Sequence, residues 1–183
     1  METAQKILPE CKVSGGVFLM EKIFVSVGTH QQQFDRLIKK MDEIALQKKG
    51  DFKVFGQIGH STYTPKNFQF KRFLSEKEFE EKIENCSLVI GHAGAGIIIS
   101  ALSHNKKAII MPRLEEFKEH TNSHQKDIAK SLAEGKKLLA VYSGESILEA
   151  IEKSREFVPE TKNHTKEIVR EIGSFVKKAL QDS

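Results

Sequence analysis

The chain has 183 residues, a length that fits one domain and suffices to bury a hydrophobic core. Its hydrophobic content of 39% and charged content of 30% are those of an ordinary globular protein, and no stretch has the apolar length of a membrane span. The net charge of +4 comes largely from lysine pairs near predicted helix ends. This placement, together with only two Tyr and no Trp to stack on bases, argues against a nucleic-acid-binding surface. The positive charge is compatible with a weak attraction to anionic lipid.

Residues 1–20 show no periodicity and contain Pro9, Gly15 and Gly16. We therefore expect a loose N-terminal extension ahead of a folded domain formed by residues 21–183. The segment lacks the basic and apolar regions of a signal peptide, so the expected location is cytoplasmic.

Apolar runs and helical periodicities alternate along the rest of the chain. Strands are expected at residues 23–27, 52–58, 68–73, 88–90, 108–111 and 138–141. Helices are expected at residues 34–44, 97–102, 121–134 and 162–180, between Ile147 and Pro159, and after a capping box at Ser75. Repeated βα units with near-continuous apolar strands predict an α/β fold, a Rossmann-like parallel sheet with helices on both faces.

A glycine-rich turn separates the strand at residues 88–90 from the helix that follows, with Gly91, Gly94 and Gly96 in six residues. Free backbone N–H groups at a helix N-terminus bind anions, and glycine lets a ligand come close to the backbone. The turn therefore indicates a phosphate or pyrophosphate site, with His92 beside it at the carboxyl end of the strand. It matches neither standard nucleotide fingerprint, and a turn that needs small residues only for packing has the same pattern.

The loop after the first strand carries Gly28 and Thr29. It should meet the glycine turn at the same edge of the sheet, where a glycine followed by a hydroxyl offers a second grip on phosphate. A tight turn with Thr29 as a helix cap is an equally valid interpretation.

The loop of residues 113–125 is dense in side chains that hydrogen-bond hydroxyl groups such as those of sugars. These side chains are Glu119, His120, Asn122, His124 and Gln125. Zinc binding by His120 and His124 is an alternative, but the HExxH order and a third ligand are missing, so no metal site is predicted. No carboxylate in these loops stands out as a general base, and the sequence thus suggests half of an active site.

Four motifs, at residues 25–29, 57–59, 92–96 and 119–125, occur in the order found in one family. Over residues 21–180 the chain resembles the C-terminal, donor-binding domain of family 28 glycosyltransferases of the GT-B fold. More closely it resembles the stand-alone small subunit of two-component polysaccharide glycosyltransferases. It is also similar to the catalytic subunit of the split UDP-N-acetylglucosamine transferase of dolichol-linked oligosaccharide assembly.

The resemblance implies an inverting transfer of a sugar from a UDP-sugar to a lipid-diphosphate-linked saccharide, with neither a cofactor nor an essential metal. It also implies a membrane-anchored partner subunit that carries the acceptor half-domain and the base. The catalytic residues of this chain are therefore unknown, and the chain is expected at the cytoplasmic membrane face through its partner. A non-catalytic UDP-sugar-binding regulatory module and an unrelated phosphate-binding α/β protein are the alternatives.

The resemblance also assigns site residues. Gly94, Ala95 and Gly96 would meet the diphosphate, with Gly28 and Thr29 on its other side, and His92 and Ala93 of the same turn are further substrate-binding candidates. His124 and Gln125 would hold the donor sugar, and backbone near Phe73 and Leu74 would read the uracil. Ser100 is a departure, because relatives with this loop often place a glutamate there on the ribose hydroxyls. This departure favours the polysaccharide type and leaves ribose recognition open.

Overall fold

The computed structural model describes residues 20–120, 124–142, 147–160, 170 and 173–174. The extension expected at residues 1–20 lies, but for Met20, outside this part, and so does almost all of the helix expected at 162–180. The domain bounds derived from the sequence stay predictions.

Six strands form one sheet in the order β3-β2-β1-β4-β5-β6, and every neighbouring pair is parallel. The strands are β1 (Glu21–Ser26), β2 (Phe52–Gln57), β3 (Gln69–Lys71), β4 (Leu88–Gly91), β5 (Lys107–Ile110) and β6 (Leu139–Ala140). The predicted Rossmann-like parallel sheet is thereby confirmed. The short apolar segment around residue 70 is the outermost strand, next to β2.

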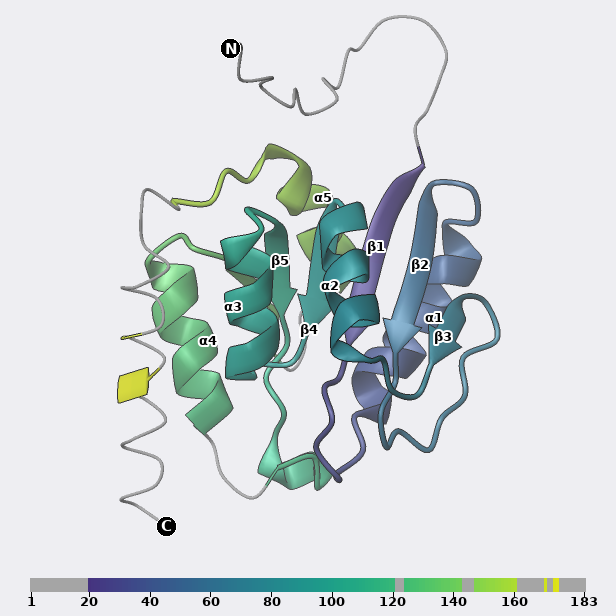
Figure 1. The fold of residues 1–183 in the computed structure, drawn as a ribbon, viewed down its shortest axis with the longest axis horizontal. Helices are drawn as coiled ribbons and strands as arrows, with labels where there is room; N and C mark the ends of the chain where they lie inside the picture. Colours follow the sequence, from purple (N-terminus) through teal and green to yellow (C-terminus); the bar gives the residue numbers. More distant parts are fainter. Residues whose placement is uncertain (1–19, 121–123, 143–146, 161–169, 171–172, 175–183) are drawn as a thin grey trace, which may run out of the picture.

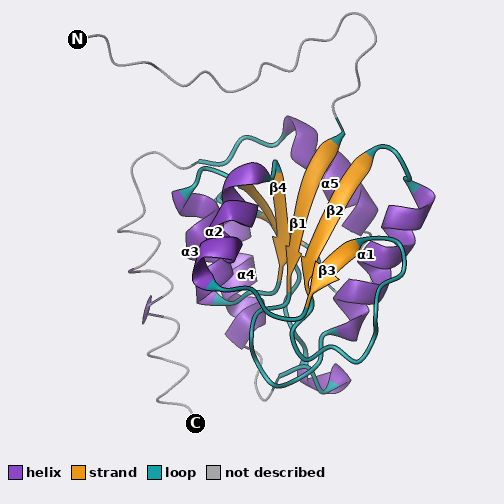
Figure 2. Ribbon diagram, turned by 45° about the vertical axis from the view of Figure 1, so that its right-hand side comes forward, coloured by secondary structure: helices purple, strands orange, loops and turns teal. Residues whose placement is uncertain are grey.

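The helices cover both faces of the sheet (Figure 2). They are α1 (Asp35–Gln47), α2 (Glu76–Asn85), α3 (Ala95–Ser103), α4 (His124–Glu134) and α5 (Ile147–Glu156), with a short 3-10 turn, η1 (Glu115–Phe117). Helices α1 and α5 lie on one face, and α2, α3 and α4 lie on the other. The capping box predicted at Ser75 and Glu78 begins α2 as expected.

Two hydrophobic cores lie against the sheet, one on each face, and every strand except the outermost β3 contributes side chains to both. In β1, Ile23 and Val25 pack into the core shared with α1 and α5, while Phe24 packs into the core shared with α2, α3 and α4. Because both faces are buried at β1, β4 and β5, the central parts of these strands have no polar side to expose, and this explains the apolar runs at residues 23–25, 88–90 and 108–110.

A polar anchor fastens the loop after β2 to α1. The carboxylate of Asp42 is buried and accepts hydrogen bonds from the Tyr63 hydroxyl at 2.7 Å and from the backbone N–H groups of Lys66 and Asn67 at 2.9 and 2.7 Å. One aspartate on α1 thus satisfies three donors from a segment more than 20 residues away in sequence.

The chain reverses its direction of winding between β1 and β4, which are neighbours although β2 and β3 come between them in sequence. Loops that follow parallel strands meet at the carboxyl edge of the sheet, which is the lower edge in Figure 1. In open α/β sheets ligands bind at this edge, at the point of reversal. Within the part of the chain that the structure describes, no helix is both long and apolar enough to cross a membrane.

Candidate functional site

The N-terminus of α3 lies at the carboxyl end of β4 and has no side-chain cap, because its N-cap residue is Gly94. The first N–H groups of a helix have no partner inside the helix. In α2 the capping box satisfies such groups, and α3 has nothing equivalent. Gly96, in the first turn, is exposed, and a Cβ added there would touch nothing within 4 Å. Packing therefore does not require this glycine, and the space above it is open to a ligand.

Two glycines make room for the ring of His92. A Cβ at Gly28, whose φ is +73°, would come within 2.6 Å of His92 Cε1, and a Cβ at Gly94 would overlap His92 Nε2 even more closely. Packing therefore accounts for Gly94 in the glycine turn, and Gly28 in the loop after β1 is confined by the same ring. This packing does not extend to Gly96. Thr29, next to Gly28, is exposed at the same edge.

His92 is a neutral group at this edge. Burial, with the nearby positive charge of Arg113, lowers the pKa of His92 to about 3. The imidazole therefore carries no charge at neutral pH, so its polar contacts are hydrogen bonds rather than ion pairs. Its buried Nδ1 has no hydrogen-bond partner.

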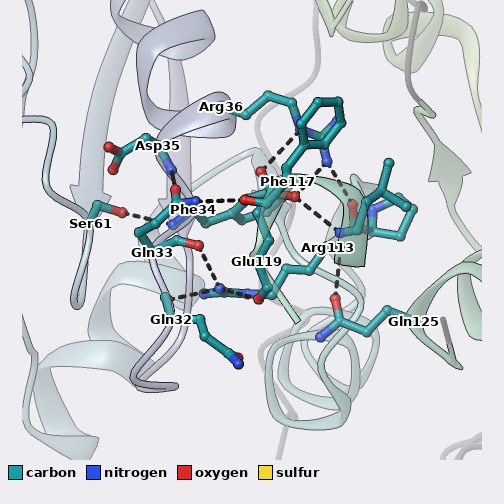
Figure 3. Close-up of polar contacts among 12 residues, drawn as sticks. Gln32, Gln33, Phe34, Asp35, Arg36, Ser61, Arg113, Phe117, Glu119 and Gln125 are labelled. Carbon is teal, nitrogen blue, oxygen red and sulfur yellow. Dashed lines mark hydrogen bonds and ion pairs between the residues drawn. The ribbon is translucent and has the colours of Figure 1, made fainter. Parts of the chain in front are cut away.

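Arg113, fully buried at the end of β5, joins the loops after β1 and β5 (Figure 3). Its guanidinium donates to the backbone carbonyl oxygens of Val27, Gln32, Gln33 and Glu119 at 2.8–3.1 Å. Burial lowers the pKa of Arg113 to about 10, so the side chain remains charged at neutral pH. One arginine therefore fixes the shape of the edge through backbone contacts.

Glu119 occupies a structural position in the same network. Its carboxylate, 1% exposed, accepts two hydrogen bonds from Arg36, at 3.1 Å to Nε and 2.8 Å to Nη2, and one from the backbone N–H of Leu114. This arrangement does not support the expectation that Glu119 binds hydroxyl groups of a ligand, because its oxygens are buried and already hold protein donors. The carboxylate instead anchors the loop after β5 to α1.

Of the remaining polar residues of this loop, the structure gives side-chain contacts for Gln125 and His120. Gln125 is 8% exposed, and its Oε1 accepts a hydrogen bond from the backbone N–H of Arg113 at 3.1 Å. The ring of His120 stacks on that of His30, with centroids 5.4 Å apart. His124 begins α4, but its side chain and all of Asn122 lie outside the described residues.

The segment expected to read the base follows β3. The backbone N–H of Leu74 donates to Oε1 of the buried Gln57 at 3.2 Å, so this N–H is already engaged. Phe73 is 45% exposed, and its ring meets that of His60 edge-on at 5.0 Å. An exposed aromatic ring at the edge offers a surface for a planar base.

Ser100, on the second turn of α3, is hydrogen-bonded to a carboxylate from a neighbouring helix. Its hydroxyl donates to Glu80 Oε1 of α2 at 3.2 Å. The other oxygen, Oε2, lies 3.3 Å from His104 Nε2. The structure thus places a glutamate beside Ser100, although the sequence does not place one at position 100.

Unpartnered buried polar atoms gather at this edge. Among the described residues, the buried side-chain N and O atoms without a hydrogen-bond partner are Gln32 Oε1, His92 Nδ1 and Arg113 Nε. Such atoms are costly to bury unless a ligand or water completes their hydrogen bonds. Among the described residues, no three His, Cys, Asp or Glu side chains converge as metal ligands would.

A model of the glycosyltransferase family 28 C-terminal domain matches residues 22–182. The chain belongs to this family. The family domain therefore spans all of the described sheet except the first residue of β1, and its members' function is glycosyl transfer.

Two relatives of this family 28 domain illustrate its range. UDP-N-acetylglucosamine transferase subunit ALG13 of Mus musculus is 30% identical over 122 residues, which are 62% of this chain and 10% of the relative. A UDP-N-acetylglucosamine–N-acetylmuramyl-(pentapeptide) pyrophosphoryl-undecaprenol N-acetylglucosamine transferase of Prochlorococcus marinus (strain MIT 9312) is 28% identical over 141 residues, which are 74% of this chain and 37% of the relative. The chain spans only a minor part of the length of either relative.

Solved structures agree on the fold. The NMR structure of ALG13 matches with a TM-score of 0.60 at 18% identity, over 85% of this chain and 96% of that one. The calicheamicin glycosyltransferase CalG4 matches with a TM-score of 0.57 at 13% identity, over 89% of this chain and 45% of that one. The family 28 domain therefore has the fold of one half of a GT-B glycosyltransferase.

Sequence patterns did not single out three residues that shape the site of this family 28 domain, namely Arg36, Glu80 and Arg113. Arg113 comes shortly after a buried strand, and this position could have indicated its role, since an arginine buried there must find hydrogen-bond acceptors. Glu80 and Arg36 gave no signal, because a charged residue on a helix is usually solvated.

Proposed function

We propose that this chain is the donor-binding subunit of a two-component inverting glycosyltransferase. It would transfer a sugar from a UDP-sugar to a lipid-diphosphate-linked saccharide in polysaccharide synthesis. The single observation that carries the proposal is the uncapped N-terminus of α3, which opens at the reversal point of the sheet beside the exposed Gly96. Family membership supports glycosyl transfer, and the names of both relatives support a UDP-N-acetylglucosamine donor.

The proposed chemistry follows from charge. Departure of UDP leaves negative charge on the diphosphate, and amide dipoles already aimed at that charge stabilise it without reorganising. The N–H groups of Ala95 and Gly96 at the start of α3 would serve this purpose. His92 would hold a phosphate oxygen or the sugar as a neutral donor, since its pKa is about 3.

The donor sugar would lie against the loop after β5, near Gln125 and His124. The Arg113 and Glu119 contacts hold this loop in place. The uracil would lie by Phe73 and Leu74, where the engaged N–H of Leu74 leaves its carbonyl and the exposed ring to meet the base.

The base and the acceptor are proposed to come from a membrane-anchored partner. Glu119, a carboxylate of the loop after β5, accepts hydrogen bonds from Arg36 and Leu114, so it is poorly placed to take a proton from an acceptor. Closure of two subunits around the donor would bring the reacting atoms together and exclude water. The chain would then work at the cytoplasmic membrane face through this partner.

Calorimetric titration of the full chain tests the nucleotide. We expect UDP and UDP-N-acetylglucosamine to bind at least tenfold more tightly than ADP or inorganic phosphate, roughly 1.4 kcal/mol or more. Equal affinity for UDP and ADP would refute the assignment.

Co-expression with a membrane-anchored protein encoded beside this chain tests the partnership. Transfer to a lipid-diphosphate-linked saccharide should appear with both chains and be nearly absent with this chain alone. A complex that binds the UDP-sugar tightly yet transfers nothing to any lipid-linked acceptor would support the regulatory-module alternative instead.

A further inference from the structure

The junction between α2 and α3 lies where two parts of the proposed site connect. Helix α2 begins directly after Phe73 and Leu74, the segment proposed to hold the base. Helix α3 begins directly after the turn proposed to hold the diphosphate. A ribose links base and diphosphate in the nucleotide, so in the proposed site it would lie where these two helices approach each other.

At that junction a carboxylate of α2 contacts α3. Glu80 on α2 accepts a hydrogen bond from the Ser100 hydroxyl of α3 at 3.2 Å. Both residues lie about 6–8 Å along their helices from the first residue, at a rise of about 1.5 Å per residue. Helical side chains tilt toward the N-terminus of their helix, so both side chains lean back toward the edge that holds the diphosphate turn.

Neighbouring groups fix the position of this carboxylate and leave it room to bind more. Ser100 contacts Oε1, and His104 Nε2 lies 3.3 Å from Oε2. His104 Nδ1 in turn lies 2.9 Å from the Ser100 carbonyl oxygen, so the histidine spans both residues. The Glu80 side chain is 39% exposed, and each ionised carboxylate oxygen accepts about two hydrogen bonds. One acceptor site on each oxygen therefore remains for a ligand.

We infer that Glu80 is the residue that recognises the ribose 2′- and 3′-hydroxyl groups of the nucleotide, with Ser100 and His104 as its positioning residues. The inference rests on the proposed function. A carboxylate with two parallel acceptors matches a vicinal diol, whose two O–H groups are both donors. Ribose recognition thus comes from α2, across the helix junction, and α3 supplies a hydroxyl that orients the carboxylate.

The test compares UDP with 2′-deoxy-UDP and 3′-deoxy-UDP by calorimetry on the full chain. Wild type should prefer UDP to each deoxy analogue by about tenfold to a hundredfold, the effect of one hydrogen bond to a charged acceptor. Glu80→Gln should reduce that preference to about threefold or less. Comparing ratios of affinities for UDP and its deoxy analogues cancels any general effect of the lost Glu80 charge on the diphosphate, since all three ligands carry the same diphosphate.

Glu84→Gln is the matched control. Glu84 lies one turn further along α2, is 63% exposed and reaches His104 Nε2 only at 4.0 Å. Its substitution should leave the preference at the wild-type value. A full preference in Glu80→Gln, or an equal loss in Glu84→Gln, overturns the assignment of Glu80.

Moving the carboxylate provides a second, independent readout. Ser100→Glu in the Glu80→Gln background places a carboxylate in the space that Glu80 Oε1 and Ser100 now share, and it should restore the preference for UDP. No restoration counts against this location for the ribose. The proposed function fails separately, when wild type binds no UDP; if it binds UDP without preferring ribose to deoxyribose, only the ribose assignment is lost.

Discussion

Ala95 offers a direct test of the anion site, because it is the first residue of α3 and is only half buried. We expect Ala95→Asp to block diphosphate binding while leaving the free protein folded. A carboxylate in the first turn of a helix is favoured by the helix dipole by about 0.3–1 kcal/mol. The substitution should therefore preserve or slightly raise the stability of the free protein.

The effect on binding follows from Coulomb's law. A phosphate held by the first amides of α3 would lie roughly 5 Å from the new carboxylate, and two unit charges at that distance repel by about 3 kcal/mol at an effective dielectric constant of about 20. Because Ala95 is half exposed, solvent screens part of this, and about 2 kcal/mol is the working value. UDP affinity should then fall about thirtyfold.

Ala95→Asn is the control, because asparagine has almost the same shape as aspartate and no charge. Calorimetry with UDP measures affinity, and urea unfolding measures stability. We expect the asparagine variant to bind UDP at least tenfold more tightly than the aspartate variant. Equal affinities in the two variants would show that no anion lies at this helix end and would refute the reasoning.

Two further predictions concern the anchors of the loops. Glu119→Gln should lower the free energy of unfolding, measured with urea, by about 3 kcal/mol, because Arg36 and the loop lose a buried charged partner. The control Glu116→Gln, at an exposed position, should change it by under about 0.5 kcal/mol. If Glu119→Gln instead keeps its stability and loses affinity for the UDP-sugar but not for UDP, Glu119 contacts the sugar. Burial alone would raise the pKa of Asp42, but hydrogen bonds from Tyr63 and from neighbouring backbone N–H groups lower it below the ordinary value of 3.8. The ionised Asp42 therefore stabilises the fold above pH 3.8, and this contribution is lost as the pH falls through the lower pKa of the folded state. Asp42→Asn should be less stable than wild type at pH 7 by about 1–3 kcal/mol and should lose less stability on acidification; parallel pH profiles in thermal unfolding would contradict this.

At the glycine turn, the local sequence pattern predicted the secondary structure but not the role of each glycine. Strand, turn and helix were predictable at residues 88–102, because apolar runs and glycines report local backbone preference. Which glycine serves packing and which leaves space for a ligand was not predictable. That distinction depends on the His92 ring, which fits between Gly28 and Gly94, residues 66 positions apart in sequence.

The loop after β5 shows the opposite limit. Its position after a strand correctly placed the loop at the carboxyl edge of the sheet, and its density of hydrogen-bonding side chains led to the prediction that Glu119 contacts a ligand. A carboxylate contacts solvent, ligand or protein according to what folds against it, and here Arg36 from α1 lies against it. Composition cannot report that pairing, since the two residues are 83 positions apart.

By itself the sequence determined the alternation of strands and helices, the doubly covered parallel sheet and the edge where the candidate loops meet, because hydrophobic periodicity and helix capping act over a few neighbouring residues. Tertiary structure decided which polar groups are hydrogen-bonded within the protein and which remain available to a ligand. It pairs Glu119 with Arg36 and sets Glu80 beside Ser100, and these contacts join helices and loops that only the packing of the sheet brings together.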